Sequence, residues 1–217
     1  MSGTDLEREK RLAAEAAAAL VEDGMTVGLG TGSTAALFVA ALGARQLDIR
    51  CVATSPATEQ AAHTAGLAVE SFVGADALAR LDIAVDGADQ VTQGRWLVKG
   101  GGGAHTREKI VAAAARQFVV IVSSDKLVEA IRPPIPLELL EYGLAATVGA
   151  FGKDVALRDA TRTPDGGVIA DWVGALESPA ALAELLAGTP GVVEHGLFPP
   201  SLVSRVLVGR GEGVERL

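Results

Sequence analysis

The sequence is poor in the residues that build disulfides and metal sites. Cys51 is the single cysteine among 217 residues, which excludes an internal disulfide and a zinc site made of cysteines. The three histidines, His63, His105 and His195, stand far apart in the sequence without the spacing of metal ligands. We therefore expect neither a disulfide nor a metal.

Long apolar runs and basic clusters are also missing. No stretch of about 18 apolar residues occurs, so no membrane-spanning helix is expected. Residues 1–10 are charged and lack the apolar centre of a signal peptide, which favours a reducing, cytoplasmic location. The net charge is −8 without a basic tract, so binding to nucleic acid or to an anionic membrane is not expected. A few well-placed donors would have to hold any anionic ligand.

Apolar residues, by contrast, make up 49% of the chain, which is enough to bury a core. Short apolar runs predict strands at residues 25–29, 49–53, 67–69, 81–85, 96–98 and 118–122. Helical patterns fall between them, beginning with a helix whose apolar face comprises Leu6, Leu12, Ala16 and Leu20. Strands that alternate with helices predict a mostly parallel sheet covered on both faces.

The pattern changes after residue 131. Three prolines in residues 132–136 indicate a boundary or a crossover. Apolar runs at 147–157, 168–173 and 192–197 then alternate with one helix at 179–186, and residues 165–167 predict a hairpin turn. The last apolar strand, 203–208, could rejoin the first sheet. We predict one domain from residues 1–131 and 202–217, and a smaller α+β domain from 132–201.

A glycine-rich turn links the first strand to the next helix. Its sequence, GLGTGSTA over residues 28–35, lets N–H groups converge at a helix N-terminus, and Thr31, Ser33 and Thr34 add hydroxyl donors. The segment is a candidate phosphate cradle, although an ordinary tight turn has a similar composition. The G-x-G-x-x-A pattern also fits a dinucleotide site, but residues 52–55 lack the acid which that fingerprint requires. No P-loop sequence occurs.

Carboxylates and lysines follow later strands. Asp86 and Asp89 stand at a strand end, where α/β proteins bind ligands, although Asp–Gly pairs also form solvated turns. Lys99 precedes four glycines between a strand and a helix, which favours a nest of N–H groups for an oxyanion over a flexible linker. Glu108, in the first turn of that helix, could be a catalytic base or could complement the helix dipole. Lys126 could pair with a phosphate or be a solvated lysine.

Together these segments resemble the signature of the ribose-5-phosphate isomerase A family. The GLGTGSTA turn, the VDGAD strand end, the KGGGGA–TREKIV block and the S-x-K element occur in that family's order, followed by IPLE at 135–138 and PGVVEHGLF at 190–198. The resemblance covers nearly the whole chain. It implies an α/β fold with a Rossmann-like three-layer domain and a mostly parallel sheet, plus a smaller ferredoxin-like α+β domain. It also implies a homodimer or homotetramer without metal or other cofactor.

The resemblance further implies that the chain interconverts ribose 5-phosphate and ribulose 5-phosphate, in the non-oxidative branch of the pentose phosphate pathway. Glu108 matches the family's proton-transferring base, and Asp86, Asp89 and Lys99 match its other catalytic residues. The substrate-binding positions carried over are Thr31, Gly32, Ser33, Thr34, Asp86, Gly87, Ala88, Asp89, Lys99, Gly100, Gly101, Gly102, Lys126 and Lys10.

Three positions depart from the family pattern. Gln90 stands where the family commonly has Glu, which removes a charge beside the site. His105 replaces a residue that is usually apolar. Asp125 directly precedes Lys126, whereas the family often has its Asp earlier. These departures concern local details of the site and none of the roles named above.

The reaction requires a proton to leave C2 and return to C1, and one carboxylate beside both carbons can do both. Lys99 and the N–H groups of residues 100–103 are candidates to hold the enediolate oxygens, and Asp86 or Asp89 to open the sugar ring. A hydride shift would need two metals, for which no ligand cluster is visible.

Two alternatives remain. One is a relative that acts on an amino-sugar phosphate or transfers coenzyme A. The other is a sugar-phosphate sensor, which predicts loss of the base, whereas Glu108 is present.

Overall fold

The computed structural model describes residues 3–160 and 162–217. It contains two compact units. The first comprises Met1–Ala88, of which residues 1 and 2 lie outside the described part, with Arg107–Leu127 and Ser201–Leu217. The second comprises Asp89–Thr106 and Val128–Pro200. The domain boundaries predicted at 131/132 and 201/202 stay a prediction. The compact units differ from them mainly in residues 89–106, which group with the second unit.

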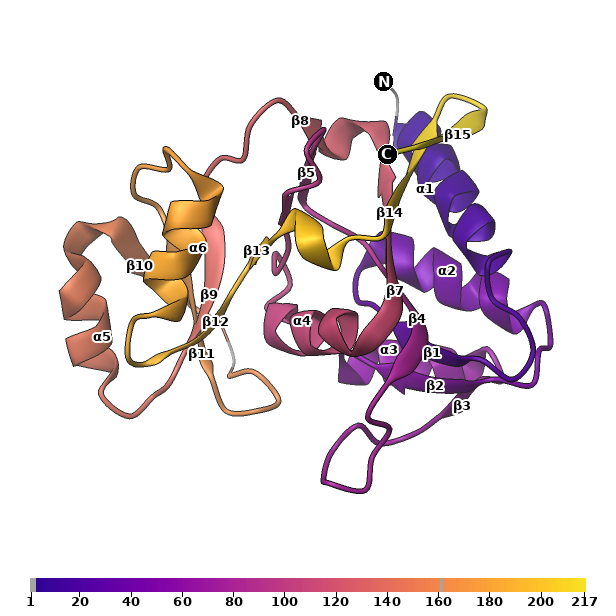
Figure 1. Cartoon of the computed structure of the whole chain (residues 1–217), viewed down its shortest axis with the longest axis horizontal. Coiled ribbons are helices and arrows are strands. Elements are labelled where there is room, and N and C mark those ends of the chain that lie inside the picture. The colour runs from indigo at the N-terminus through magenta and orange to yellow at the C-terminus, as the bar shows by residue number, and fades with distance from the viewer. Residues whose placement is uncertain (1–2, 161) are drawn as a thin grey trace. The chain divides into compact units, whose positions relative to one another are not determined.

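A seven-stranded sheet forms the centre of the first unit (Figure 1), in the order β15-β14-β7-β4-β1-β2-β3. Neighbouring strands are parallel except β14 and β15, which are antiparallel. The mostly parallel sheet is thus confirmed, as is the return of the last apolar strand. The strands are β1 (Thr26–Leu29), β2 (Arg50–Ala53), β3 (Ala68–Val69), β4 (Leu81–Asp86), β7 (Ala115–Ser123), β14 (Arg205–Arg210) and β15 (Gly213–Arg216).

Helices cover both faces of this sheet. α1 (Gly3–Ala18) and α2 (Ser33–Gly43) share a core with Val27 and Leu29 of β1. The intervening residue, Gly28, points to the opposite face because successive strand residues alternate. A Cβ on Gly28 would lie 2.4 Å from Cγ1 of Val111, which belongs to α4 (His105–Ala114). α4 therefore covers that opposite face, and the unit has the expected three layers.

Small side chains determine how α1 packs. Its fully buried apolar positions are Ala13, Ala14, Ala17 and Ala18, and the predicted Ala16 and Leu20 lie at the edge of this face. Alanines let a helix approach a sheet closely. The approach is so close that a Cβ on Gly209 of β14 would lie 1.9 Å from the carbonyl oxygen of Glu9. α3 (Pro56–Thr64) packs beside α2, and at its start Ser55 accepts a hydrogen bond from the N–H of Thr58.

The second unit contains a βαββαβ arrangement, which is the ferredoxin-like order expected from the resemblance. All strand pairs in its sheet, β10-β11-β9-β12, are antiparallel. The elements are β9 (Ile135–Leu139), α5 (Leu144–Phe151), β10 (Val155–Leu157), β11 (Val168–Trp172), α6 (Pro179–Ala187) and β12 (Val192–His195). The predicted strand at 147–157 is wrong in its first part, because residues up to Phe151 continue the helix α5.

A further sheet, β13-β6-β5-β8, consists of strands of two or three residues, and its pairs β13–β6 and β6–β5 are antiparallel. These strands are β5 (Gln90–Thr92), β6 (Leu97–Val98), β8 (Leu127–Val128) and β13 (Leu197–Phe198). Such lengths are too short for a recognisable hydrophobic period, so most of this sheet escapes prediction. Within the described part of the chain, none of the helices has the length and apolar character to span a membrane.

Candidate active site

The carboxyl ends of β1 and β4 meet at the centre of the seven-stranded sheet. From β1 the chain proceeds outward to β2 and β3, and from β4 it proceeds the other way to β7 and β14. The direction of strand order therefore reverses between β1 and β4, and open α/β sheets bind ligands at such a switch point. Three predicted segments lie at this edge: the turn 30–34 after β1, Asp86 at the end of β4, and residues 123–126, which begin with the last residue of β7.

Asp86 fastens the two strand ends to each other. Its Oδ1 accepts hydrogen bonds from the N–H of Thr31 at 3.0 Å and from the N–H of Gly87 at 2.7 Å. A Cβ on Gly30 would lie 2.1 Å from Cγ of Asp86, so only glycine fits there. The side chain is buried, with 3% of Asp86 exposed. Hydrogen bonds to an ionised carboxylate are strong, and they fix this carboxylate in one orientation.

The first turn of α2 offers backbone N–H groups to an anion. Gly32 precedes the helix with φ of 112°, no side chain caps the helix, and its first turn holds no acidic residue. The N–H groups at such an end lack intrahelical partners, and the helix dipole adds positive potential. Ser33 is exposed and Thr34 partly exposed beside them. This geometry suits a phosphate group.

The hydroxyl of Thr31 is engaged within the protein. It donates to Oγ of Ser55 at 2.9 Å and lies 2.8 Å from Oγ1 of Thr54 and 3.2 Å from Oγ1 of Thr58. A hydroxyl has one proton to donate, and this one is used between the ends of β1 and β2. Thr31 therefore shapes the turn, and its contact with a phosphate stays a prediction.

The two lysines predicted for the phosphate side belong to this unit. Nζ of Lys126 lies 3.3 Å from Oδ2 of Asp125, and Nζ of Lys10 lies 2.6 Å from Oε1 of Glu7. Each ammonium group thus has a neighbouring carboxylate. A phosphate would compete with these carboxylates for both lysines.

Glu9 is a buried carboxylate that the sequence analysis missed. Its Oε2 accepts from the N–H and the hydroxyl of Ser124, at 2.9 and 2.7 Å, and its Oε1 accepts from the N–H of Gly211 at 2.9 Å. Burial raises the pKa of Glu9, but the hydrogen bonds from Ser124 and Gly211 outweigh it and hold the pKa below its ordinary value. Glu9 therefore ties α1 to the segment that carries Lys126.

Glu108 stands at the same edge as Asp86. α4 ends at Ala114, directly before β7, which begins opposite the first residue of β4, so the helix runs back along the sheet. Val111 packs over Gly28 in the middle of β1. Glu108 lies one turn, about 4.5 Å, nearer the carboxyl edge and on the same face of the helix. That brings it toward the carboxyl end of β1, since a strand advances only about 3.3 Å per residue beyond Gly28. Only 4% of Glu108 is exposed.

In the second unit, the glycine-rich segment forms a tight loop after β6. Lys99 is 3% exposed, and its Nζ lies 5.7 Å from the centre of the Phe198 ring. Gly100 has φ of 98°, and a Cβ there would lie 2.6 Å from Nδ1 of His105. The side chain of His105, one of the three departures from the family pattern, therefore packs against the start of this loop. The N–H of Gly101 donates to Oδ2 of Asp89 at 2.9 Å, which joins two predicted segments.

Two further charged groups of the second unit contact predicted residues, and the sequence analysis missed both. Arg158 donates to the carbonyl oxygens of Gly100 and Gly101, at 3.1 and 2.9 Å. Glu138 is buried and accepts from the hydroxyls of Thr106, in the first turn of α4, and Thr163. Their partners lie between 25 and 58 residues away along the chain, beyond the reach of a local pattern.

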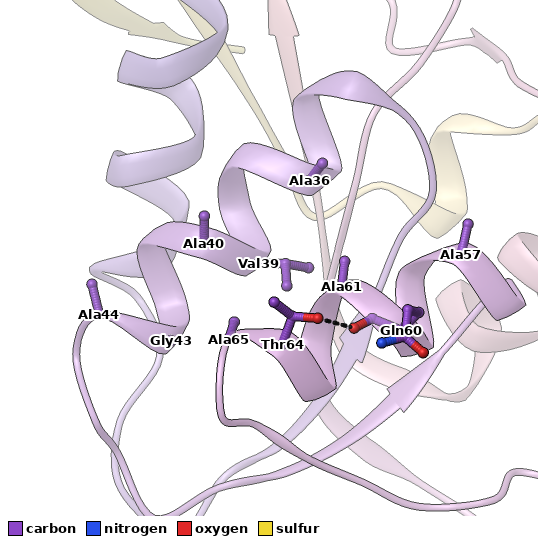
Figure 2. A pocket seen from close by; sticks show the side chains of 10 residues that line it. All are labelled: Ala36, Val39, Ala40, Gly43, Ala44, Ala57, Gln60, Ala61, Thr64 and Ala65. Carbon is purple, nitrogen blue, oxygen red and sulfur yellow. Dashed lines mark hydrogen bonds between the residues drawn. The ribbon is translucent and has the colours of Figure 1, made fainter.

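A separate groove lies between α2 and α3 (Figure 2), with a volume of about 660 Å³. Small side chains line it, including Ala36, Ala40, Ala44, Ala57, Ala61 and Ala65. It contains none of the predicted site residues. Among the described residues, no three His, Cys, Asp or Glu side chains are grouped to hold a metal ion.

Comparison with known proteins gives consistent matches. The family model of ribose 5-phosphate isomerase A (phosphoriboisomerase A) matches residues 50–213. The ribose-5-phosphate isomerase A of Caulobacter sp. (strain K31) is 45% identical over 224 residues, covering 96% of this chain and 97% of that protein. The protein of the same name from Natronomonas pharaonis is 44% identical, with 96% of each chain covered.

Solved structures agree. Ribose 5-phosphate isomerase A from Methanocaldococcus jannaschii superposes with a TM-score of 0.88 at 36% identity, covering 96% of this chain and 97% of that one. A D-ribose-5-phosphate isomerase in complex with phospho-erythronic acid superposes with a TM-score of 0.89 at 33% identity, covering 98% of both chains.

Proposed function

The chain belongs to the ribose-5-phosphate isomerase A family, and from that premise we propose that it interconverts ribose 5-phosphate and ribulose 5-phosphate through an enediolate, with Glu108 as the base. The observation that carries this proposal is the place of Glu108. It is a buried carboxylate, one helical turn beyond Val111, which packs over Gly28, toward the carboxyl edge of the sheet where β4 ends at Asp86. Buried carboxylates at the carboxyl edge of a parallel sheet are suited to proton transfer.

The phosphate group is proposed to bind at the N-terminus of α2. Its uncapped N–H groups, the hydroxyls of Ser33 and Thr34, and the ammonium groups of Lys126 and Lys10 would neutralise and orient it. Binding energy at this remote group holds the reacting carbons in place and so contributes to the rate of the chemical step.

Glu108 is proposed to take the proton from C2 of the open-chain sugar. The electron pair of that C–H bond forms the C1–C2 double bond, and the carbonyl oxygen on C1 becomes an enediolate oxygen. Return of the proton to C1, with transfer of the O2 proton to O1, leaves the carbonyl at C2. Lys99 and the N–H groups of residues 100–103 are the proposed donors to the enediolate. In support, one relative binds phospho-erythronic acid, whose carboxylate resembles the planar two-oxygen anion of an enediolate.

Ring opening is assigned to Asp86 and Asp89 together. Asp89 follows Asp86 by three residues, so covalent geometry keeps their Cα atoms within about 11 Å. The homodimeric or homotetrameric state and the cytoplasmic location stay predictions, and light scattering of the purified protein would test the first.

The decisive variant is Glu108→Gln, which keeps the shape of the side chain but cannot accept the proton. We expect kcat for ribose 5-phosphate to fall by at least about 10²–10⁴-fold with little change in KM. The matched control is Glu59→Gln, because Glu59 is the first-turn glutamate of α3 and is exposed. If Glu108 merely complemented its helix dipole, both variants would behave alike.

Deuterium exchange separates Glu108 from the aspartates. In D₂O, the wild type is expected to place deuterium on the carbon that receives the proton, unless the transfer is faster than exchange with solvent. Asp86→Asn and Asp89→Asn are expected to slow ring opening more than C–H cleavage. The base is misassigned if Glu108→Gln keeps nearly full kcat while either aspartate variant abolishes exchange at C2.

A further inference from the structure

We propose that Arg158 is a positioning residue for this reaction. It holds the peptide group between Gly100 and Gly101 in one orientation, so that the glycine-rich loop and Asp89 keep the geometry that the substrate needs. The inference rests on the proposed function, because it assigns the loop to the enediolate oxygens, and it concerns a residue outside all the predicted site segments.

Arg158 and Asp89 hold this peptide group from both ends. The carbonyl oxygen of Gly100 accepts from Nη1 of Arg158 at 3.1 Å. The N–H of the same peptide group, on Gly101, donates to Oδ2 of Asp89 at 2.9 Å. Nη1 also donates to the carbonyl oxygen of Gly101 at 2.9 Å, which extends the constraint to the next peptide group. Rotation of either peptide group would break a hydrogen bond to a charged partner.

Glycines 100–103 supply no rigidity of their own. Glycine loses more backbone freedom on ordering than any other residue, and Gly100 and Gly103 both have positive φ, at 98° and 77°. The order of the loop must therefore come from its partners. Arg158 is such a partner, since its charged guanidinium bonds two successive carbonyl oxygens of this loop.

Arg158 is itself held rigidly. It lies directly after β10, and its Nε and Nη2 donate to the two carboxylate oxygens of Asp171 in β11, each at 2.6 Å. β10 and β11 pair directly, with Ala156 opposite Asp171. The hydrogen bonds from Asp171 raise the pKa of Arg158, partial burial lowers it, and the charges of Asp171 and Asp89 raise it further. A bidentate pair fixes the plane of the guanidinium, which leaves Nη1 aimed at the loop.

The chain offers a matched control in Arg50. Its Nε and Nη2 also form a bidentate pair, with Glu70 at 2.5 and 2.9 Å, and both side chains are substantially exposed. Arg50 lies in β2, outside every segment assigned to the substrate. Loss of this pair is expected to leave the kinetics unchanged, since exposed ion pairs contribute little.

The test compares Arg158→Met, Arg158→Lys, Asp171→Asn and Arg50→Met with the wild type. Wild-type turnover of ribose 5-phosphate tests the proposed function by itself. With an active wild type, we expect Arg158→Met to lower kcat about 10–100-fold, since a misplacement of about 1 Å can cost that much. The inhibition constant of phospho-erythronic acid should rise by a similar factor, whereas that of inorganic phosphate should change by less than about twofold. Arg158→Lys should recover part of the loss in kcat. Arg50→Met should keep the wild-type kcat and both wild-type inhibition constants.

The double variant Arg158→Met/Asp171→Asn adds a second criterion. Because both residues act through one set of contacts, it should be no slower than Arg158→Met alone. The inference is overturned if folded Arg158→Met keeps wild-type kcat and wild-type inhibition by phospho-erythronic acid. It is also overturned if Arg158→Met weakens both inhibitors equally. A double variant whose loss of kcat equals the product of the two single losses would overturn it as well. Should Arg158→Met fail to fold, Arg158→Lys and Asp171→Asn decide by the same kinetic criteria.

Discussion

Replacing Gly30 with alanine tests whether Asp86 must remain where the structure has it. The new Cβ would lie 2.1 Å from both Cγ and Oδ1 of Asp86, whereas carbon atoms in contact are normally about 3.5 Å apart. Asp86 must then move by more than about 1 Å, which breaks its hydrogen bonds to the N–H groups of Thr31 and Gly87. Each such bond to a charged group contributes about 1.5–3 kcal/mol, so the loss reaches about 3 kcal/mol or more.

That loss should appear both in stability and in turnover. For a chain of this size, about 3 kcal/mol lowers Tm by roughly 6–12 °C. Because Asp86 is proposed to act on the substrate, its displacement should lower kcat/KM by about 10²-fold. Thermal unfolding followed by circular dichroism and a ribulose 5-phosphate assay measure the two effects. The control is Gly94→Ala, since a Cβ there meets only Oγ1 of Thr92, at 3.9 Å.

A double variant makes the reasoning refutable. If the clash with Asp86 is the cause, then Gly30→Ala should cost almost no further stability in an Asp86→Gly background, which removes the Cβ of residue 86 as well as its carboxylate and so leaves no collision partner. The argument fails if Gly30→Ala melts within about 1 °C of the wild type and keeps its kcat/KM. It fails equally if the cost of Gly30→Ala is the same with and without the Asp86 side chain.

Four further outcomes are expected. Lys126→Ala should chiefly raise KM for ribose 5-phosphate, and an unchanged kcat/KM would remove Lys126 from the phosphate site. Activity should survive exhaustive chelation with EDTA, and loss that a divalent ion restores would contradict the metal-free mechanism. The pKa of Glu9 is below its ordinary 4.5, so its stabilising effect is complete above that pH and is lost as the pH falls through the folded-state value. The Tm difference between the wild type and Glu9→Gln should therefore shrink on acidification from about pH 6 to pH 3. Burial, with the charge of Glu70, raises the pKa of Cys51 to about 12, so a disulfide reagent should label this thiol at neutral pH only when the protein unfolds.

Local order was predictable from the sequence because its causes are local. The parallel strands, the helices between them and the turn at 30–34 follow from apolar periodicity and from glycine and hydroxyl residues at fixed offsets. The same reasoning placed Asp86 at a strand end and Glu108 in the first turn of a helix, and the structure has both there. Carboxyl ends of parallel strands share one edge, so the candidate site could be expected before the strand order was known.

Partners distant in sequence were decided by the tertiary structure. Arg158 contacts Gly100 across 58 residues of sequence, and Glu9 contacts Ser124 across 115. No local sequence pattern around Arg158 or Glu9 indicates these contacts. The partner of a polar side chain depends on which elements pack together and in which register, and periodicity does not encode that information. The strand β5 and the helix α5 were not predicted from the sequence, for a related reason. The first is too short to show a period, and the second is an apolar run that suits a buried strand as well as a helix until packing selects one.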